Sequence, residues 1–223
     1  MPLAQRFHDR AQAGKLLARP LRAYAGRADA IVLALPRGGV PVGYALAQAL
    51  ALELDVLLVR KLGLPGHEEF AIGAVASGGV RVLHRDVIGA HGLSDAQIEA
   101  AAVREMAEIA ARERRYRGER PVAPLCGRVA ILVDDGMATG ASMRAAVRAA
   151  RQREPARIVV ALPVGAPDSC AALAGEVDEL VCLCTPLRFY AVSQWYEHFE
   201  QTSDGEVQEL LSKAARIPHG GTK

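Results

Sequence analysis

Short runs of almost continuous apolar residues, separated by helix-like stretches, constrain the fold of this chain most strongly. The runs span residues 30–35, 54–59, 129–133, 157–162 and 179–184. A short run that is apolar at consecutive positions is typical of a strand buried on both faces. Helical composition or spacing predicts helices at 7–25, 41–51, 142–153 and 168–175. Strands alternating with helices predict an α/β fold, in which a central parallel sheet of about five strands carries helices on both faces.

Other segments do not fit this simple alternation. Ser77-Gly78-Gly79 separates two short apolar runs and predicts a hairpin. Ser94 and Gln97 form a capping-box pattern that opens a long helix over 94–118, and Ser203 with Glu206 opens a final helix. We expect a single domain over 1–215, followed by a flexible tail over 216–223. Within it we expect a core at about 28–187, a helical insertion at 84–122, and a hood built from 1–27 and 186–215.

Composition excludes several classes of function. The 27 basic and 25 acidic residues of the 223-residue chain give a net charge of +2, which provides no electrostatic footprint for nucleic acid or an anionic membrane. The longest apolar run has ten residues, too few to cross a bilayer. The N-terminus has no stretch of signal-peptide type, so we expect a cytoplasmic protein. The four cysteines form no CxxC pair and are expected to be free thiols.

The most informative motif follows the third apolar run. Asp134 and Asp135 come first, and a loop with two glycines and two hydroxyl side chains then leads into a predicted helix. Ligands of parallel sheets bind beyond the carboxyl ends of the strands. Backbone N–H groups at a helix start bind an anion, whereas neighbouring carboxylates suit hydroxyl groups or a divalent cation. A sugar phosphate is the simplest ligand with both features, and neither the P-loop nor the dinucleotide-binding pattern occurs.

The run from Val133 to Ser142 resembles the motif that binds 5-phosphoribosyl 1-diphosphate (PRPP) in type I phosphoribosyltransferases. The resemblance implies that Asp134 and Asp135 bind the ribose hydroxyls. It also implies that the following residues bind the 5′-phosphate: Ala138, Thr139, Gly140, Ala141 and Ser142.

Two further stretches resemble the same family and occur in the expected order. Pro36-Arg37-Gly38-Gly39, after the first strand, is similar to the family's pyrophosphate loop, which often contains a non-proline cis peptide bond. Arg60 and Lys61, placed directly after the predicted second strand, resemble basic residues that neutralise pyrophosphate. The resemblance therefore assigns Arg37, Gly38, Gly39, Arg60 and Lys61 to pyrophosphate.

The resemblance implies transfer of the 5-phosphoribosyl group from PRPP to a nitrogenous base of purine or pyrimidine type, with release of pyrophosphate. Mg²⁺ would be held through substrate and water, without direct protein ligands. An alternative is a regulatory protein that senses PRPP or a nucleotide without turnover. A phosphohydrolase with the two acids as metal ligands would need further acids after other strands, where Arg and Pro stand instead. A homodimer is left open.

Two regions depart from the commonest family pattern and resemble a group of bacterial phosphoribosyltransferases with a long helical insertion. The segment 63–125 is long, and we expect a catalytic loop over 62–69, where His67, Glu68 and Glu69 are either general acid–base candidates or solvated residues. The segment 186–199 holds five of the ten aromatic residues. Phe189, Tyr190 and Trp195 are candidates for stacking on the acceptor base, and the alternative is a satellite hydrophobic cluster.

Overall fold

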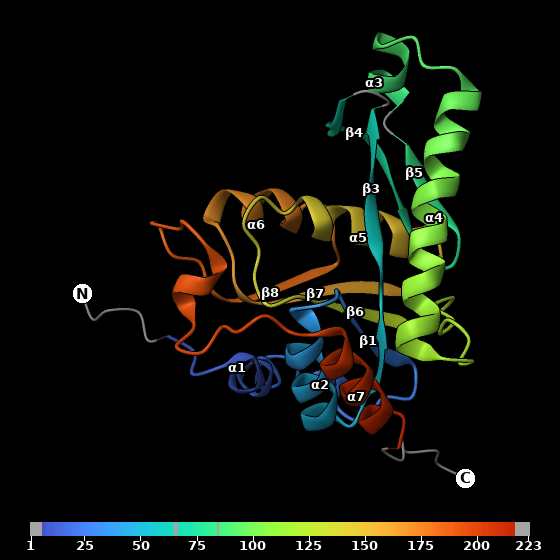
Figure 1. Cartoon of the computed structure of the whole chain (residues 1–223). Helices are drawn as coiled ribbons and strands as arrows, with labels where there is room; N and C mark the ends of the chain where they lie inside the picture. The colour runs from blue at the N-terminus through green and yellow to red at the C-terminus, as the bar shows by residue number, and fades with distance from the viewer. Residues whose placement is uncertain (1–5, 65–66, 84, 217–223) are drawn as a thin grey trace.

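A five-stranded parallel sheet forms the centre of the computed structural model, which describes residues 6–64, 67–83 and 85–216 (Figure 1). Its strands are β1 (Ala30–Ala34), β2 (Glu53–Val56), β6 (Val129–Val133), β7 (Arg157–Val164) and β8 (Glu179–Cys184). They are ordered β2-β1-β6-β7-β8, and every neighbouring pair is parallel. The predicted α/β fold with about five parallel strands is therefore confirmed.

Helices cover both faces of this sheet. On one face lie α1 (Arg10–Leu17), α2 (Gly39–Leu50) and α7 (Asp204–Ala214), and on the other lie α5 (Ala141–Arg151) and α6 (Pro167–Ala174) (Figure 1). Successive side chains of a strand point to opposite faces. Val32 and Ala34 of β1 accordingly join the hydrophobic core beneath α2, whereas Ile31 and Leu33 join the core beneath α5. This double burial explains why the strands are apolar at every position.

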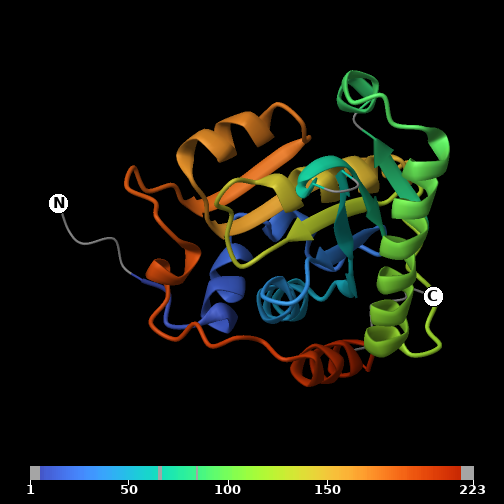
Figure 2. The same cartoon turned by 45° about the horizontal axis from the view of Figure 1, so that its top comes forward.

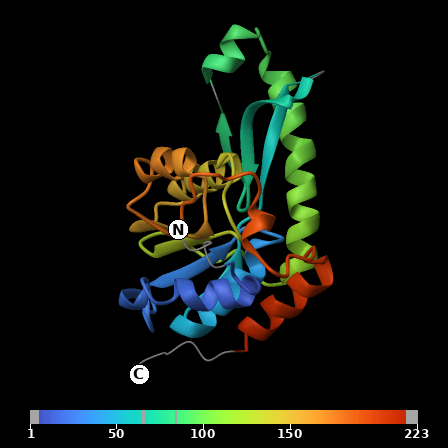
Figure 3. The same ribbon diagram turned by 90° about the vertical axis from the view of Figure 1, so that its left-hand side faces the viewer.

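A second, antiparallel sheet rises from the core beside a long helix (Figure 3). Its strands β3 (Val59–Leu64), β4 (His67–Ala76) and β5 (Val80–Leu83) precede α3 (Arg85–Ala90) and α4 (Asp95–Arg117). The predicted hairpin at Ser77-Gly78-Gly79 joins β4 to β5, and the capping box of Ser94 and Gln97 opens α4 as expected. Figure 2 shows α4 along one side of the molecule.

The prediction of a single second strand over 54–59 is wrong. The first part of this apolar run belongs to the parallel sheet, and its end belongs to the antiparallel sheet. The N–H of Leu57 still donates to the Ala34 carbonyl at 3.0 Å, next to β1. One residue later, the Leu58 carbonyl accepts from the Ser77 N–H at 2.9 Å, beside the second sheet. Leu57 and Leu58 are both buried. The run is therefore continuous in sequence although the chain changes sheets within it.

The predicted helix over 7–25 is also wrong in length. The helix α1 ends at Leu17, and a short 3₁₀ helix, η1 (Arg22–Tyr24), follows. Pro20 has no N–H to continue the hydrogen-bond ladder of α1. The chain turns there, which buries the side chains of Leu21 and Tyr24.

A segment near the N-terminus pairs with residues 195–197 beside the sheet. The N–H of Phe7 donates to the Trp195 carbonyl at 2.9 Å, and the N–H of Glu197 donates to the Phe7 carbonyl at 2.9 Å. Trp195 ends the 3₁₀ helix η2 (Val192–Trp195), and α7 lies further along the chain. The predicted tail lies outside the described residues from 217 onward, and no helix within the described part is long and apolar enough to cross a membrane.

A buried ion pair holds the C-terminal end of α4 against the parallel sheet. Arg117 donates from Nε to Asp55 Oδ1 at 2.7 Å and from Nη1 to Glu113 Oε1 at 2.8 Å. Asp55 Oδ2 also accepts from the N–H of Ala123 at 3.2 Å. Both Arg117 and Asp55 are buried. Asp55 is the one charged residue in its apolar run, and this pairing explains its presence there.

We predict that Arg117→Met lowers the free energy of unfolding by about 3–5 kcal/mol, because the buried Asp55 would lose the guanidinium that forms its ion pair. Urea denaturation measures this loss. Arg115→Met is the control on the same helix, since the exposed Arg115–Asp204 ion pair should contribute less than about 1 kcal/mol. Equal losses in the two variants would contradict the proposed role of the buried pair.

Candidate functional site

The candidate site lies where the order of the parallel strands reverses. The first strand, β1, lies between β2 and β6, so the chain leaves β1 and β6 in opposite directions. The N–H of Leu35 donates to the Val133 carbonyl at 2.8 Å, which holds the ends of these two strands together. Such a switch point leaves a crevice at the carboxyl ends of the strands. The turn at 36–39 and the acids at 134–135 therefore lie on the same edge of the sheet.

The turn at 36–39 approaches the two acids so closely that only glycine fits. A Cβ atom on Gly38 would lie 2.0 Å from Asp135 Oδ2, and one on Gly39 would lie 2.7 Å from the Val133 carbonyl oxygen. The peptide bond between Pro36 and Arg37 is cis. This geometry matches the cis peptide that the resemblance implied for the turn.

The side chain of Asp134 is half-buried in the crevice. Its Oδ1 accepts from the N–H of Asp135 at 2.9 Å. Burial raises the pKa of the Asp134 carboxyl well above its ordinary value, and the neighbouring charge of Asp135 raises it further. A ligand that donates hydroxyl groups, or brings a cation, would relieve this cost.

Asp135 has a partner that the sequence did not reveal. Arg10 of α1 donates from Nε to Asp135 Oδ2 at 2.9 Å, and Arg10 Nη2 lies 2.8 Å from the same oxygen. Burial raises the pKa of Asp135, and the Arg10 charge partly opposes this rise. The Arg10 guanidinium also lies 3.9 Å from the centre of the Phe199 ring, and Tyr196 Oη donates to the Asp135 carbonyl at 2.6 Å. Asp135 is therefore held by structural partners even without a ligand.

The loop after the acids is held rigidly but remains open to solvent. The N–H of Met137 donates to the Val164 carbonyl at 2.9 Å, and the N–H of Ala166 donates to the Met137 carbonyl at 2.8 Å. Gly140 has a φ of +74° and immediately precedes α5. The remaining predicted phosphate residues are exposed, namely Ala138, Thr139, Ala141 and Ser142. Thr139 Oγ1 lies 3.5 Å from the N–H of Ala141. An anion can reach this helix start from solvent.

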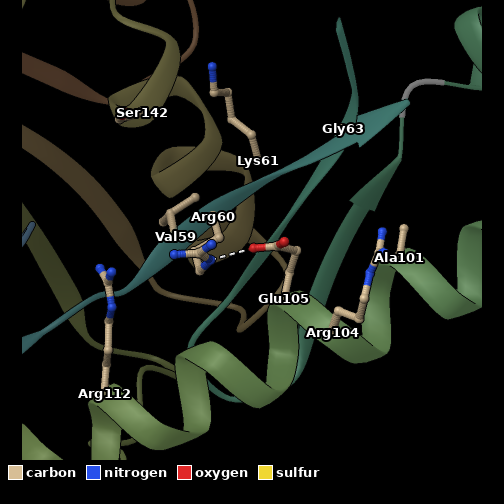
Figure 4. A pocket seen from close by; sticks show the side chains of 9 residues that line it. All are labelled: Val59, Arg60, Lys61, Gly63, Ala101, Arg104, Glu105, Arg112 and Ser142. Carbon is tan, nitrogen blue, oxygen red and sulfur yellow. Dashed lines mark hydrogen bonds and ion pairs between the residues drawn. The ribbon is translucent and has the colours of Figure 1, made fainter. Parts of the chain in front are cut away.

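The predicted basic residues line two separate cavities. Arg37 contributes to a cavity of about 290 Å³ that Arg10, Asp135 and Phe199 also line. The Nη1 atom of Arg37 lies 4.0 Å from Asp204 Oδ1. Arg60 and Lys61 contribute to a cavity of about 600 Å³ that reaches Ser142 (Figure 4). Their predicted position after the second strand of the parallel sheet is wrong, because they lie within β3.

The aromatic candidates occupy different surroundings. Phe189 and Trp195 pack, partly buried, against the satellite hydrophobic cluster around Phe7 and Tyr196. Tyr190 is 78% exposed. Phe199, which was not singled out, is instead the ring that contacts Arg10 beside Asp135. Spacing along the sequence gives no signal for this contact, because it joins residues that are far apart in the chain.

The expected catalytic loop at 62–69 lies in strands β3 and β4 on either side of residues 65–66. The side chains of His67, Glu68 and Glu69 lie outside the described part of the structure. Among the side chains that are described, no three His, Cys, Asp or Glu residues form a group suited to hold a metal ion.

Fold and site together define an α/β protein whose strand switch point holds two carboxylates, a glycine turn and an open helix start. Residues 5–182 match the family model of the phosphoribosyl transferase domain. The chain belongs to this phosphoribosyl transferase family.

Relatives with similar sequences carry the same name. The chain is 47% identical over 210 residues to "Putative phosphoribosyl transferase Rv0571c" of Mycobacterium tuberculosis H37Rv and to its counterpart MT0597 of strain CDC 1551. These matches cover 94% of this chain but 47% of each relative, so the chain spans about half their length. The crystal structure of TT1426 from Thermus thermophilus is 43% identical, with a TM-score of 0.82, and the match covers 94% of this chain and 99% of that one.

We predict that Asp134→Asn raises the thermal stability of the ligand-free protein at neutral pH. In the wild type, the raised pKa of Asp134 means that the folded state binds a proton at this carboxyl more tightly than the unfolded chain does. Ionised Asp134 therefore destabilises the fold as pH rises through that pKa, whereas protonation removes the penalty as pH falls. Scanning calorimetry at about pH 5 and about pH 8 should show a larger advantage of the Asn variant at the higher pH. A variant less stable than wild type at both values would contradict this account.

Proposed function

We propose that this protein binds PRPP and transfers its 5-phosphoribosyl group to a nitrogenous base, with release of pyrophosphate. The observation that carries the proposal is the meeting of Asp134 and Asp135 with the glycine turn at 36–39 and the open helix start at 138–142. The family is a family of transferases. The crevice offers separate places for hydroxyl groups and for phosphate groups, as this ligand requires.

The residues of the crevice would act mainly by positioning and by charge. The N–H groups and hydroxyls of the loop at 138–142 would hold the 5′-phosphate. Asp134 and Asp135 would accept hydrogen bonds from the ribose hydroxyls. The bond from C1 to the pyrophosphate oxygen breaks, and its electron pair leaves with pyrophosphate. A lone pair of the base nitrogen then forms the new bond to C1, and the base gives up a proton to solvent.

Positive charge develops on the ribose ring as this bond breaks. The two carboxylates lie where they would stabilise that charge, and their desolvation makes the interaction stronger than it would be in water. Asp135 would first have to exchange its contact with Arg10 for contacts with the sugar. Arg10 would then remain stacked on Phe199 near the same carboxylate.

We propose that Mg²⁺ binds together with PRPP, held mainly through the substrate and water. The oxygen atoms of pyrophosphate and ribose suit this ion, which keeps several waters and takes few protein ligands. Asp134 and Asp135 supply carboxylate oxygens at the crevice, which is the donor type that Mg²⁺ prefers. When bound, the ion would neutralise charge on the departing pyrophosphate.

Calorimetry with Mg²⁺ and PRPP tests the proposal directly. We expect Asp135→Asn to raise the Kd for PRPP by about tenfold to a hundredfold, because hydrogen bonds to a charged acceptor are lost. Asp29→Asn is the matched control, since Asp29 forms an exposed ion pair with Arg27 away from the crevice. An unchanged Kd in Asp135→Asn would remove the assignment of this acid to ribose.

Release of pyrophosphate then separates transfer from binding alone. The wild-type protein should release pyrophosphate from PRPP only when an acceptable base is present. A panel of purine and pyrimidine bases, followed by a pyrophosphate assay, identifies that base. Tight binding of PRPP without release in any member of the panel would select the regulatory alternative, in which the protein senses PRPP or a nucleotide.

A second prediction concerns the phosphate loop. Thr139→Val combined with Ser142→Ala should raise the Kd for ribose 5-phosphate by about tenfold to a hundredfold, through loss of two hydroxyl donors to a charged group. Fluorescence or calorimetric titration measures the change. Ser193→Ala is a control, because Ser193 is an exposed residue of η2 outside this loop. Equal affinity of the double variant and wild type would show that the 5′-phosphate binds elsewhere.

A further inference from the structure

The helical insertion forms one wall of a basic cavity. The cavity, of about 600 Å³, lies between β3 and α4 and reaches Ser142 at the start of α5. Arg60 and Lys61 come from β3, whereas Arg104 and Arg112 come from α4. Figure 4 shows both α4 arginines rising toward β3 on either side of Arg60 and Glu105.

The charges of this cavity are unbalanced. Among the residues that the structure describes, Glu105 is the one acidic residue lining the cavity, and it forms an ion pair with Arg60. Within the described part of the chain, no acidic side chain forms an ion pair with Lys61, Arg104 or Arg112. Three uncompensated cations around one cavity repel each other, and an anion with several charges would relieve that repulsion.

The cavity also borders the loop at 138–142, the proposed phosphate loop. Ser142 belongs to the phosphate loop and lines the cavity as well. Near the lower end of α4, burial raises the pKa of Tyr116 to about 12, and the charges of Arg112 and Arg37 oppose that rise. The charges of Arg112 and of Arg37 in the glycine turn therefore both act on the same phenol.

We propose that α4 supplies Arg104 and Arg112 as diphosphate-binding residues of this protein. The inference rests on the proposed function, since the diphosphate is that of PRPP bound in the adjoining crevice. Arg60 and Lys61 approach the diphosphate from β3, and the two arginines approach it from α4. The insertion is then part of the binding site and gives the ligand a second basic wall.

Titrations with inorganic pyrophosphate and with ribose 5-phosphate, both in the presence of Mg²⁺, test this assignment. Arg104→Gln and Arg112→Gln should each weaken pyrophosphate binding by about fivefold to tenfold, through loss of a charge-assisted contact. Ribose 5-phosphate binding should change by less than about twofold, because its phosphate would bind at 138–142. Arg114→Gln is the control, since Arg114 is an exposed residue of α4 that does not line the cavity.

Glu105→Gln should change pyrophosphate affinity in the opposite direction to the arginine variants. It removes the acidic charge and releases Arg60, so pyrophosphate should bind about threefold to tenfold more tightly. A purely structural role for the Arg60–Glu105 pair would not produce tighter binding. Thermal unfolding of each variant confirms that it folds.

The outcomes separate this inference from the proposed function. Unchanged pyrophosphate affinity in both arginine variants, or no pyrophosphate binding by the wild type, would overturn the role of α4. If the arginine variants weakened the binding of ribose 5-phosphate as much as that of pyrophosphate, the assignment of these arginines to the diphosphate would be overturned. If wild type binds pyrophosphate through Arg104 and Arg112 but does not bind Mg²⁺–PRPP, the basic site stands and the proposed function fails.

Discussion

The partial burial of two adjacent carboxylates at the end of β6 is the constraint on which the rest of the site depends. Asp134 and Asp135 repel each other, and desolvation penalises both charges. Asp134 receives one backbone N–H, and Asp135 receives the guanidinium of Arg10. A protein retains such a costly arrangement when a ligand uses it. The surrounding elements can be understood as the means of holding these two groups in place.

The strand order provides that support. Because β1 lies directly beside β6, the glycine turn at 36–39 comes against the two acids, and it needs glycine at both Gly38 and Gly39 to do so. Hydrogen bonds from Met137 to the end of β7 and from Ala166 to Met137 fix the start of the loop at 138–142. A segment near the N-terminus then pairs with residues 195–197 and brings Arg10, Tyr196 and Phe199 to Asp135. Rigid backbone therefore surrounds the acids on several sides.

Much of this could be predicted from the sequence because it depends on local patterns. Doubly buried strands are apolar at every position, and the residues after them mark the ligand edge of the sheet. The change of sheet at Leu57 and Leu58 could not be predicted, since residues buried in two different sheets look like one strand. Arg10 was missed for a related reason. In a chain with many arginines, no local pattern distinguishes one that pairs with an acid 125 positions away.

A crystal structure of the protein with Mg²⁺ and PRPP is the most direct test of the central claim. We expect the 5′-phosphate within hydrogen-bonding distance of backbone N–H groups at 139–142, and the ribose hydroxyls at Asp134 and Asp135. Asp135 should have exchanged its contact with Arg10 for the sugar. A ligand bound elsewhere, with the Arg10–Asp135 pair intact and the crevice empty, would contradict the account.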